Sequence, residues 1–392
     1  MEINGLIIRY GEIALKKKNR RKFEDSLKRN INKFIDREGY SYILKRLHGR
    51  FHIVGENFDK TFKNHLSLVP GITSFSEVYY SEIVDDEKIL KDSFKYFLKS
   101  KPLGKFNFRI RVKRADKRFK FTSMEFEKKV AEYIYENYEA SSNLSVKLKN
   151  SDYVLEIDIR SEGVFIFHER ESGTGGLPIG SSGRFLSLLS GGIDSPVATY
   201  SIMKRGGVVD CLSFYSPPYI GEKSRQKFID LVEKLSLIQG KMRLYIVPFT
   251  EIQEMIRDKV SDEYRTIFYR RFMFEVGNII AEKNYYDGFV TGEALGQVAS
   301  QTIQNIACIE EAANFPILRP LIAFDKDNIV NIAKKLRTFD ISIIPAPDTC
   351  TLFAPLKPKI KGKMEDILKN SENLDYQLVK RAAENVELVE IG

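Results

Sequence analysis

The chain has 392 residues, of which 43% are hydrophobic and 29% are charged, a composition that excludes a disordered or fibrous protein. Its length predicts two or three domains and at least one full hydrophobic core. The formal net charge is +9, and no stretch approaches the roughly 18 apolar residues of a membrane span.

The number and positions of the cysteine and histidine residues exclude several kinds of catalytic and metal-binding site. The three cysteines, Cys211, Cys308 and Cys350, are too few for a disulfide framework and include no CxxC pair. We therefore expect reduced thiols in a cytoplasmic protein, without a cysteine-rich zinc site or an iron–sulfur cluster. All four histidines lie between positions 48 and 168, which excludes a histidine-based catalytic or metal site in the second half. Charge interrupts the first residues too early for a signal peptide.

The excess positive charge belongs to the first part of the chain. Residues 1–172 contain 35 Lys and Arg against 26 Asp and Glu, whereas residues 173–392 contain 27 of each kind. Such asymmetry indicates a part that binds a polyanion, joined to a part with another task. The alternative is an ordinary basic surface.

The first 57 residues predict a small α+β unit. A strand at 2–10 precedes an amphipathic helix at 19–37, and two short strands follow at 41–47 and 50–54. A basic cluster lies just before and at the start of the helix. The candidate nucleic-acid-binding residues in it are Lys16, Lys17, Lys18, Arg20 and Arg21.

Residues 58–172 predict a second α+β unit. Its expected helices lie at 59–68, 86–99 and 123–138, and its strands at 73–83, 106–114, 144–149, 152–160 and 163–169. Thr122 and Glu125 have the spacing of a capping box at the start of the third helix.

The strand at 106–114 alternates apolar residues with cations, which predicts an apolar inner face and a cationic outer face. A row of fixed guanidinium groups suits a phosphate backbone, and a solvated strand face is the alternative. The nucleic-acid-binding candidates in and after this strand are Arg109, Arg111, Lys113, Arg114, Lys117 and Arg118.

A glycine-rich segment at 171–183 predicts a linker, whose contact with a functional site is left open. After it the pattern changes. Strands at 184–189, 207–214, 242–248 and 288–291 alternate with helices near 195–205, 222–238, 263–283, 297–312 and 325–337. This alternation predicts a doubly wound α/β domain with a parallel sheet and helices on both faces, in which ligands bind at the carboxyl ends of the strands.

The first strand of this domain runs into the motif Ser190-Gly191-Gly192-Ile193-Asp194-Ser195-Pro196 and then into a helix. The glycines allow a tight turn with accessible N–H groups, and the helix directs its positive end at the loop. These features predict a pocket for a phosphate chain, in which Asp194 holds Mg²⁺. The alternative is a glycine-rich turn of any doubly wound fold.

The SGGxDS pattern resembles the pyrophosphate loop (PP-loop) of the ATP pyrophosphatases, which cleave ATP between its α- and β-phosphates to adenylate a substrate. Further segments resemble one family, the tRNA 4-thiouridine synthetases (tRNA sulfurtransferases). These segments are residues 173–180, 213–218, 269–273, 291–301, 318–322 and 348–353. The resemblance covers essentially the whole chain. It implies a ferredoxin-like domain at 1–57, a THUMP RNA-binding domain at 58–172 and a PP-loop ATP pyrophosphatase domain at 173–392.

The resemblance also implies roles for single residues. The nucleotide contacts that it implies, together with those of the loop, are Leu188, Leu189, Ser190, Gly191, Gly192, Asp194, Ser195, Ser213, Phe214, Arg270, Gly292 and Gln301. Arg270 would neutralise phosphate charge, Lys326 would be a functional lysine, and Cys350 would be the sulfur-carrying nucleophile. From local sequence alone, the same residues are a helix-surface arginine, a helix-start lysine and an inert thiol.

Cys211 and Cys308 lie in apolar surroundings and are expected in the core, with Cys308 the better candidate for a second, resolving cysteine. Some members of the family carry a C-terminal rhodanese domain with the persulfide cysteine. This chain ends too soon after Cys350 for such a domain, so the route of the sulfur stays open. Thiazole synthesis for thiamine through that domain is not expected.

We therefore predict an ATP- and Mg²⁺-dependent tRNA sulfurtransferase. It would adenylate uridine 8 of tRNA and replace O4 with persulfide sulfur, giving 4-thiouridine. The expected partners are tRNA and a cysteine desulfurase, with no membrane, and a homodimer is left open. Two alternatives remain: another RNA-modifying PP-loop adenylase with a different nucleophile, and a tRNA-binding protein whose nucleotide site is only structural. A THUMP-linked methyltransferase is disfavoured because no second glycine-rich cofactor strand is present.

Overall fold

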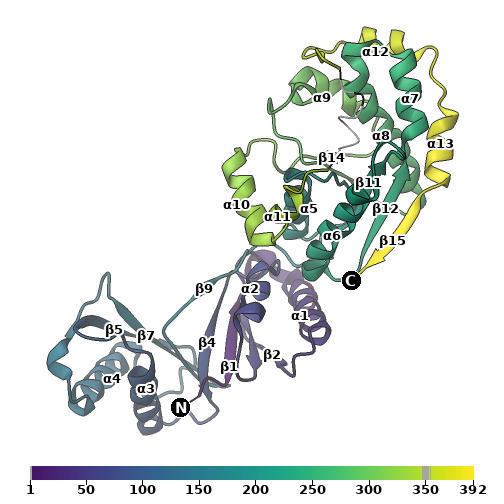
Figure 1. Ribbon diagram of the computed structural model, residues 1–392. Coiled ribbons are helices and arrows are strands. Elements are labelled where there is room, and N and C mark those ends of the chain that lie inside the picture. Colours follow the sequence, from purple (N-terminus) through teal and green to yellow (C-terminus); the bar gives the residue numbers. More distant parts are fainter. Residues whose placement is uncertain (1, 347–352, 354) are drawn as a thin grey trace. The chain divides into compact units, whose positions relative to one another are not determined.

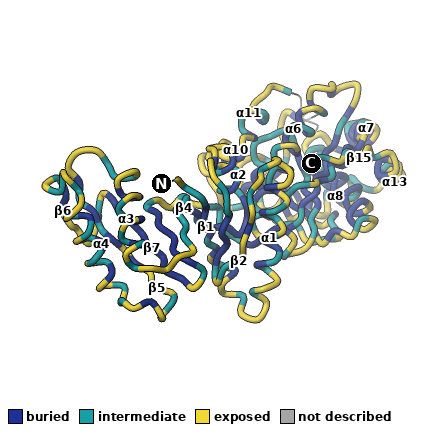
Figure 2. The backbone as a smooth tube through the Cα atoms, turned by 90° about the horizontal axis from the view of Figure 1, so that it is seen from below, coloured by how far each residue is buried: buried dark blue, intermediate teal, exposed yellow. Residues whose placement is uncertain are grey.

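The computed structural model describes residues 2–346, 353 and 355–392. The chain divides into two compact units, one up to Gly176 and one from Leu177 onward, which we call the N-terminal and C-terminal units. Figure 2 shows that burial in each unit follows the strands, whereas turns and outer helix faces are exposed. Among the described residues, no helix combines the length and the apolar character needed to cross a membrane.

One nine-stranded sheet runs through the N-terminal unit (Figure 1). Its order is β2 (Ile43–Leu47), β3 (Arg50–Val54), β1 (Gly5–Arg9), β4 (Ser74–Ser81), β8 (Gly163–Phe167), β7 (Tyr153–Arg160), β5 (Phe106–Arg114) and β6 (Leu144–Val146). The short β9 (Glu171–Ser172) also pairs with β4. Strand β5 is parallel to β6 and β7, and the other pairs are antiparallel.

Helices cover this sheet over two hydrophobic cores. They are η1 (Glu12–Asn19), α1 (Arg20–Arg37), α2 (Lys60–Leu68), α3 (Asp86–Ser100), α4 (Ser123–Asn137) and η2 (Ser141–Asn143). The core under α1 and α2 includes Phe62, Leu66 and Phe75, so the packing of the first predicted unit continues beyond residue 57. The core under α3 and α4 takes its strand residues from β5, β7 and β8.

Two local predictions for this unit are confirmed. Thr122 accepts a hydrogen bond from the Glu125 N–H, and the Glu125 carboxylate accepts one from the Thr122 N–H, which is the capping box of α4. Along β5, every second residue from Phe106 to Val112 is buried, whereas Arg111 and Lys113 are exposed. The predicted cationic outer face of this strand is therefore confirmed.

The C-terminal unit is a doubly wound α/β domain, as predicted. Its sheet has the order β14 (Ile317–Leu318), β13 (Gly288–Val290), β10 (Arg184–Leu188), β11 (Val208–Tyr215), β12 (Met242–Pro248) and β15 (Glu387–Ile391). All neighbours are parallel except β15, which runs antiparallel to β12.

Helices pack on both faces of this sheet (Figure 1). Ser187 of β10 bonds to Thr199 of α5 (Asp194–Lys204) on one face, and α6 (Glu222–Gln239) packs beside α5. On the other face, Leu186 joins a large core. The helices of that core are α7 (Thr250–Lys259), α8 (Arg265–Lys283), α9 (Ile303–Glu310), α12 (Met364–Ser371) and α13 (Gln377–Glu384).

Several elements differ from the sequence prediction. The structure contains helix α7 and η3 (Asp262–Tyr264), which the sequence analysis did not predict. The helix expected at 297–312 is shorter in the structure, where η4 (Ala299–Gln301) and α9 occupy this range. Thr302 explains the shortening, because its side chain caps α9 by accepting a hydrogen bond from the Asn305 N–H. The helix predicted near 325–337 is present as α10 (Lys326–Leu336) and is followed by a left-handed Arg337, whereas α11 (Phe339–Ser342) was not predicted. Strand β15 is also absent from the sequence prediction.

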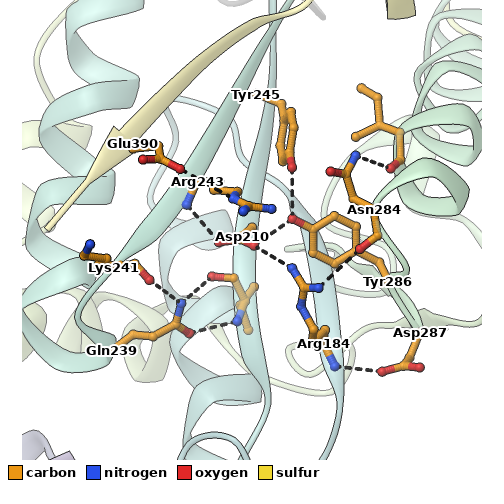
Figure 3. Close-up of polar contacts among 12 residues, drawn as sticks. Arg184, Asp210, Gln239, Lys241, Arg243, Tyr245, Asn284, Tyr286, Asp287 and Glu390 are labelled. Atoms are coloured by element: carbon orange, nitrogen blue, oxygen red, sulfur yellow. Dashed lines mark hydrogen bonds and ion pairs between the residues drawn. The ribbon is translucent and has the colours of Figure 1, made fainter.

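A buried polar network fixes the amino ends of the central strands (Figure 3). Asp210 of β11 accepts a hydrogen bond from the Tyr286 hydroxyl (2.6 Å) and one from the backbone N–H of Arg243 on β12 (2.8 Å). Arg184, the first residue of β10, lies 3.7 Å from the same carboxylate and stacks over the Tyr286 ring. One side chain thus ties together β10, β11, β12 and the turn before β13, at the edge opposite the carboxyl ends.

The predicted linker is hydrogen-bonded within each unit. The Gly175 N–H donates to the Ile72 carbonyl, and the Leu177 N–H donates to the Lys204 carbonyl. The N–H groups of residues 180–182 all donate to the Gly206 carbonyl.

Candidate active site

A pocket lies at the carboxyl edge of the C-terminal sheet, where the strand order reverses. From β10 the chain continues to β11 and β12 on one side, and later returns to β13 and β14 on the other. Doubly wound sheets bind ligands at such a switch point. The pocket measures about 310 Å³ and is lined by Leu188, Leu189, Ser190, Asp194, Ser195, Leu212, Phe214, Phe228, Arg270, Met273, Thr291, Gly292, Glu293, Val298, Ser300 and Gln301.

The serine–glycine loop closes on itself at one side of the pocket. Ser195 Oγ accepts a hydrogen bond from the Ser190 N–H (3.0 Å) and donates one to the Ser190 carbonyl (3.1 Å). Ile193 is the N-cap of α5 and makes no side-chain capping hydrogen bond. The first N–H groups of α5 therefore lack a side-chain cap, an arrangement that favours a bound anion.

Close approach, rather than a left-handed backbone, explains the glycines of the site. Gly191 and Gly192 do not have positive φ, and a Cβ on Gly191 would lie 3.3 Å from Lys227 Cδ. Gly292 is more restricted, because its Cβ would lie 2.8 Å from the carbonyl carbon of Asp194. Gly292 thus lets the segment after β13 approach the start of α5.

Two side chains hold Asp194 at the mouth of the pocket. Lys326 Nζ lies 2.5 Å from one carboxylate oxygen, and Gln297 Nε2 donates to the other over 3.2 Å. Lys326 does not line the pocket and reaches the site through Asp194. A single carboxylate of this kind can bind Mg²⁺ together with phosphate oxygens.

Arg270 of α8 enters the pocket beside a buried carboxylate. Its Nη2 lies 2.9 Å from Glu293 Oε1, and Arg319 Nε donates to Glu293 Oε2 over 2.7 Å. Glu293 is 1% exposed. Burial acts to raise the pKa of Glu293, but its attraction to Arg270 and Arg319 outweighs burial and lowers the pKa. The carboxylate is therefore ionised between two guanidinium groups.

Most of the predicted nucleotide contacts come together in this pocket. Of those predicted, Gly191, Gly192 and Ser213 do not line it. Ser213 is fully buried and donates to the Leu189 carbonyl (2.9 Å), so it supports the end of β10 from behind.

Seven lining residues are absent from the sequence prediction. Five of them belong to the segments 269–273 and 291–301 that carry the family resemblance, and the other two, Leu212 and Phe228, have only the apolar periodicity of a core. They are Thr291, Glu293, Val298, Ser300, Leu212, Phe228 and Met273.

Cys350 lies outside the described residues. Cys211 is fully buried and Cys308 is 2% exposed, both as expected for core thiols. Burial raises the pKa of both thiols, and a neutral buried thiol is a poor nucleophile. The structure therefore gives no support to Cys308 as a resolving cysteine.

The predicted RNA-binding cations of the N-terminal unit form two groups. One group anchors the fold: Arg20 bonds to Glu24 (2.8 Å), Arg109 to the Leu148 carbonyl (2.7 Å), and Arg114 to the carbonyls of residues 119 and 121. The other group is exposed and consists of Lys17, Lys18, Arg21, Arg111, Lys113, Lys117 and Arg118, of which Arg118 pairs with Asp116. Lys16 is half-buried over the Phe23 ring.

Comparison with known proteins places the whole chain among well-described relatives. The family described as "Thiamine biosynthesis protein (ThiI)" matches residues 180–376, a ThiI ferredoxin-like domain matches 5–76, and a THUMP domain matches 84–169. A probable tRNA sulfurtransferase of Clostridium kluyveri is 39% identical over 98% of this chain and 99% of its own length. One of Coxiella burnetii is 42% identical over 98% of each chain.

Solved structures agree. A crystal structure of a 4-thiouridine synthetase–RNA complex with bound ATP matches with a TM-score of 0.89 and 36% identity, over 100% of both chains. The protein PH1313 from Pyrococcus horikoshii matches with a TM-score of 0.65 and 28% identity, over 85% of this chain and 99% of that one.

Proposed function

This chain belongs to the tRNA sulfurtransferase (4-thiouridine synthetase) family, and on that premise we propose that it thiolates tRNA in the cytoplasm at the expense of ATP. The reaction is adenylation of O4 of uridine 8, followed by replacement of that oxygen with sulfur. The observation that carries this proposal is the pocket at the end of β10, where the serine–glycine loop, the uncapped start of α5 and Arg270 converge.

The chemistry of the pocket suits ATP. Leu188, Leu189 and Phe214 provide an apolar wall for the adenine, and the start of α5, which has no side-chain cap, suits the polyphosphate. Arg270 adds a fixed positive charge. The pocket therefore offers an apolar surface for the base and a positive surface for the phosphates, and a nucleoside triphosphate requires both.

Asp194 is the residue that would hold Mg²⁺, together with phosphate oxygens. When bound, the ion neutralises charge on the phosphates. Lys326 and Gln297 fix the direction of the Asp194 carboxylate, so a role for Lys326 follows from its contact with Asp194.

In the adenylation step, uracil O4 bonds to the α-phosphorus and the bond to the bridging oxygen breaks. Pyrophosphate leaves with the electron pair, and the uracil loses its N3 proton to water. Arg270 stabilises the charge that develops on the phosphate oxygens.

In the second step, Cys350 carries sulfur as a persulfide received from a cysteine desulfurase. The terminal sulfur bonds to C4, the C4–O4 bond breaks and AMP leaves. A second thiol then attacks the Cys350 sulfur, which frees the thiolated base and forms a disulfide that an external thiol reduces. The family resemblance supports Cys350. The burial of Cys211 and Cys308 favours a second thiol from another molecule.

We propose that residues 1–57 and 58–172 hold the tRNA and that residues 173–392 perform the chemistry. The exposed cations of the N-terminal unit support this division, and Arg111 and Lys113 are its best-placed members because they project from one strand. A homodimer stays a prediction, which light scattering can check.

The test is thiolation of an unmodified tRNA transcript by the purified protein with ATP, Mg²⁺ and a persulfide donor. We expect 4-thiouridine in the digested tRNA, and none when uridine 8 is replaced by cytidine. Absence of both 4-thiouridine and pyrophosphate release would contradict the proposal. Full activity of Cys350→Ser would instead favour an RNA-modifying adenylase with another nucleophile.

A further inference from the structure

Four charged side chains form an alternating series from the surface to the nucleotide pocket. Glu310 contacts Arg319 (2.8 Å), Arg319 contacts Glu293 (2.7 Å), and Glu293 contacts Arg270 (2.9 Å). Exposure of the side chains falls from 52% at Glu310 to 12% at Arg319 and 1% at Glu293, and is 18% at Arg270. The series therefore passes through the interior and ends at the phosphate-facing side of the pocket.

Glu293 is held far more rigidly than the arginine that it contacts. It follows Gly292 directly after β13, where close contact with α5 fixes the backbone. The Thr291 hydroxyl (2.9 Å) and Arg319 both donate to Oε2, so the carboxylate has a defined orientation. Arg270, in contrast, has a long side chain with many rotamers, and ordering such a side chain costs conformational entropy.

Glu293 is the main anchor of Arg270 among the described residues. The other polar contact of the Arg270 guanidinium, to Ser300 Oγ, is 3.5 Å long. Oε1 of Glu293 forms its ion pair with Arg270 and has no further hydrogen bond in the described part of the chain. Glu293 lines the pocket but is 1% exposed, so its side chain offers a bound molecule little surface.

We propose that Glu293 is a positioning residue for the reaction: it holds the Arg270 guanidinium at the phosphates, and Arg319 keeps the Glu293 carboxylate in place. This inference rests on the proposed role of Arg270. Because Glu293 is shared with Arg319, which carries a second positive charge, Arg270 is not fully neutralised by its ion pair and stays attractive to phosphate.

The neighbouring residue supplies a matched comparison. Arg271 forms an analogous ion pair with Glu311 (2.5 Å), but neither residue lines the pocket. Glu311→Gln therefore removes a carboxylate from the neighbouring arginine of α8 and leaves the contacts of Arg270 intact.

The test is a double-mutant cycle read by the Kd for ATP·Mg²⁺ and by tRNA-dependent pyrophosphate release. We expect Glu293→Gln to weaken ATP binding and turnover by about tenfold each, and by less than about twofold when Arg270 is already alanine. Glu311→Gln should leave both readouts unchanged. Equal losses from Glu293→Gln in both backgrounds would overturn the proposal, because Glu293 would then act independently of Arg270.

A charge-balanced variant covers the case in which Glu293→Gln does not fold. Glu293→Gln combined with Arg319→Met removes one charge of each sign and keeps the net charge around Arg270. Native thermal stability with a tenfold loss of ATP affinity supports positioning, whereas native affinity overturns it. ATP affinity is measured without tRNA, so a wild-type protein that binds ATP but makes no 4-thiouridine contradicts the proposed function alone.

Discussion

Asp194 brings three separate segments of the chain to one carboxylate: the start of α5, the loop that carries Gln297, and the start of α10 with Lys326. This residue therefore has two functions that can be separated. Its shape and hydrogen bonds assemble the mouth of the pocket, and its charge suits a metal-bound nucleotide.

Asp194→Asn tests the charge while it preserves the shape. We expect tRNA-dependent pyrophosphate release to fall by about 100-fold or more, with unchanged tRNA affinity, because the substitution removes the proposed metal ligand and the ion pair with Lys326 but changes nothing in the N-terminal unit. Asp325→Asn, at the N-cap of α10, is the control and should retain turnover. Native turnover by Asp194→Asn would remove the residue from the catalytic machinery.

The burial of His52 in the N-terminal unit should make the stability of the protein depend on pH. The ring is 1% exposed and packs edge-on against Tyr80 and Phe165. Burial, with a smaller effect of Lys45, lowers the pKa of His52 to about 4. The unfolded chain therefore takes up a proton near pH 6.5, before the folded chain does.

Stability due to this shift is fully present above pH 6.5 and is lost as the pH falls towards 4. The loss should reach about 3 kcal/mol, since one pKa unit corresponds to about 1.4 kcal/mol. We expect His52→Gln to flatten the decline of thermal stability between pH 6.5 and 4, with the exposed His48→Gln as the control. An unchanged slope in His52→Gln would contradict this account.

At the scale of elements, β5 shows that one basic strand can hold cations with different functions. Arg114 donates to two carbonyls in the turn that leads to α4, whereas Arg111 and Lys113 project outward. The sequence pattern predicts the outward face but does not distinguish the anchoring arginines from the exposed ones, because the anchoring carbonyls are set by the turn geometry.

Arg111→Ala and Arg114→Ala should separate these functions. We expect Arg111→Ala to weaken tRNA binding and to lower the slope of log affinity against log salt by about one, with unchanged thermal stability. Arg114→Ala should lower the melting temperature instead. Filter binding over a salt series and thermal melts check both, and an unchanged slope in Arg111→Ala would exclude a phosphate contact.

The features that could be predicted from the sequence follow from local patterns. The features that were missed depend on contacts between residues far apart in the chain. The strand ends at Leu188 and Phe214 are readable because buried parallel strands are apolar and their ends face the ligand. The ion pair between Glu293 and Arg319 could not be predicted from the sequence, because it depends on the register of β13 with β14. Strand β15 was missed because its only partner is β12, more than a hundred positions earlier.

In the molecule as a whole, the change in net charge along the chain coincides with the boundary between the two compact units. No charged residue lies between 173 and 176, so the excess positive charge of residues 1–172 belongs entirely to the N-terminal unit. Each unit also has its own hydrophobic core. The proposed RNA-binding cations and the proposed nucleotide pocket thus belong to separately packed parts of the chain.

Calorimetry of the full chain should therefore show two unfolding transitions. We expect a non-hydrolysable ATP analogue with Mg²⁺ to raise the melting temperature of one transition and leave the other unchanged, because a ligand stabilises only the part that it binds. The Asp194→Asn variant is the control, in which the shift should shrink. A single transition that moves as a whole would show that the two units unfold cooperatively.

The uncapped first turn of α5 has a consequence for the reaction cycle. Main-chain N–H groups recognise phosphate oxygens whatever base is attached, so the loop proposed to receive ATP would be equally suited to the diphosphate that departs. Inhibition by that product, competitive with ATP, follows from this feature. Selection of adenine over other bases must then reside in the apolar wall of Leu188, Leu189 and Phe214.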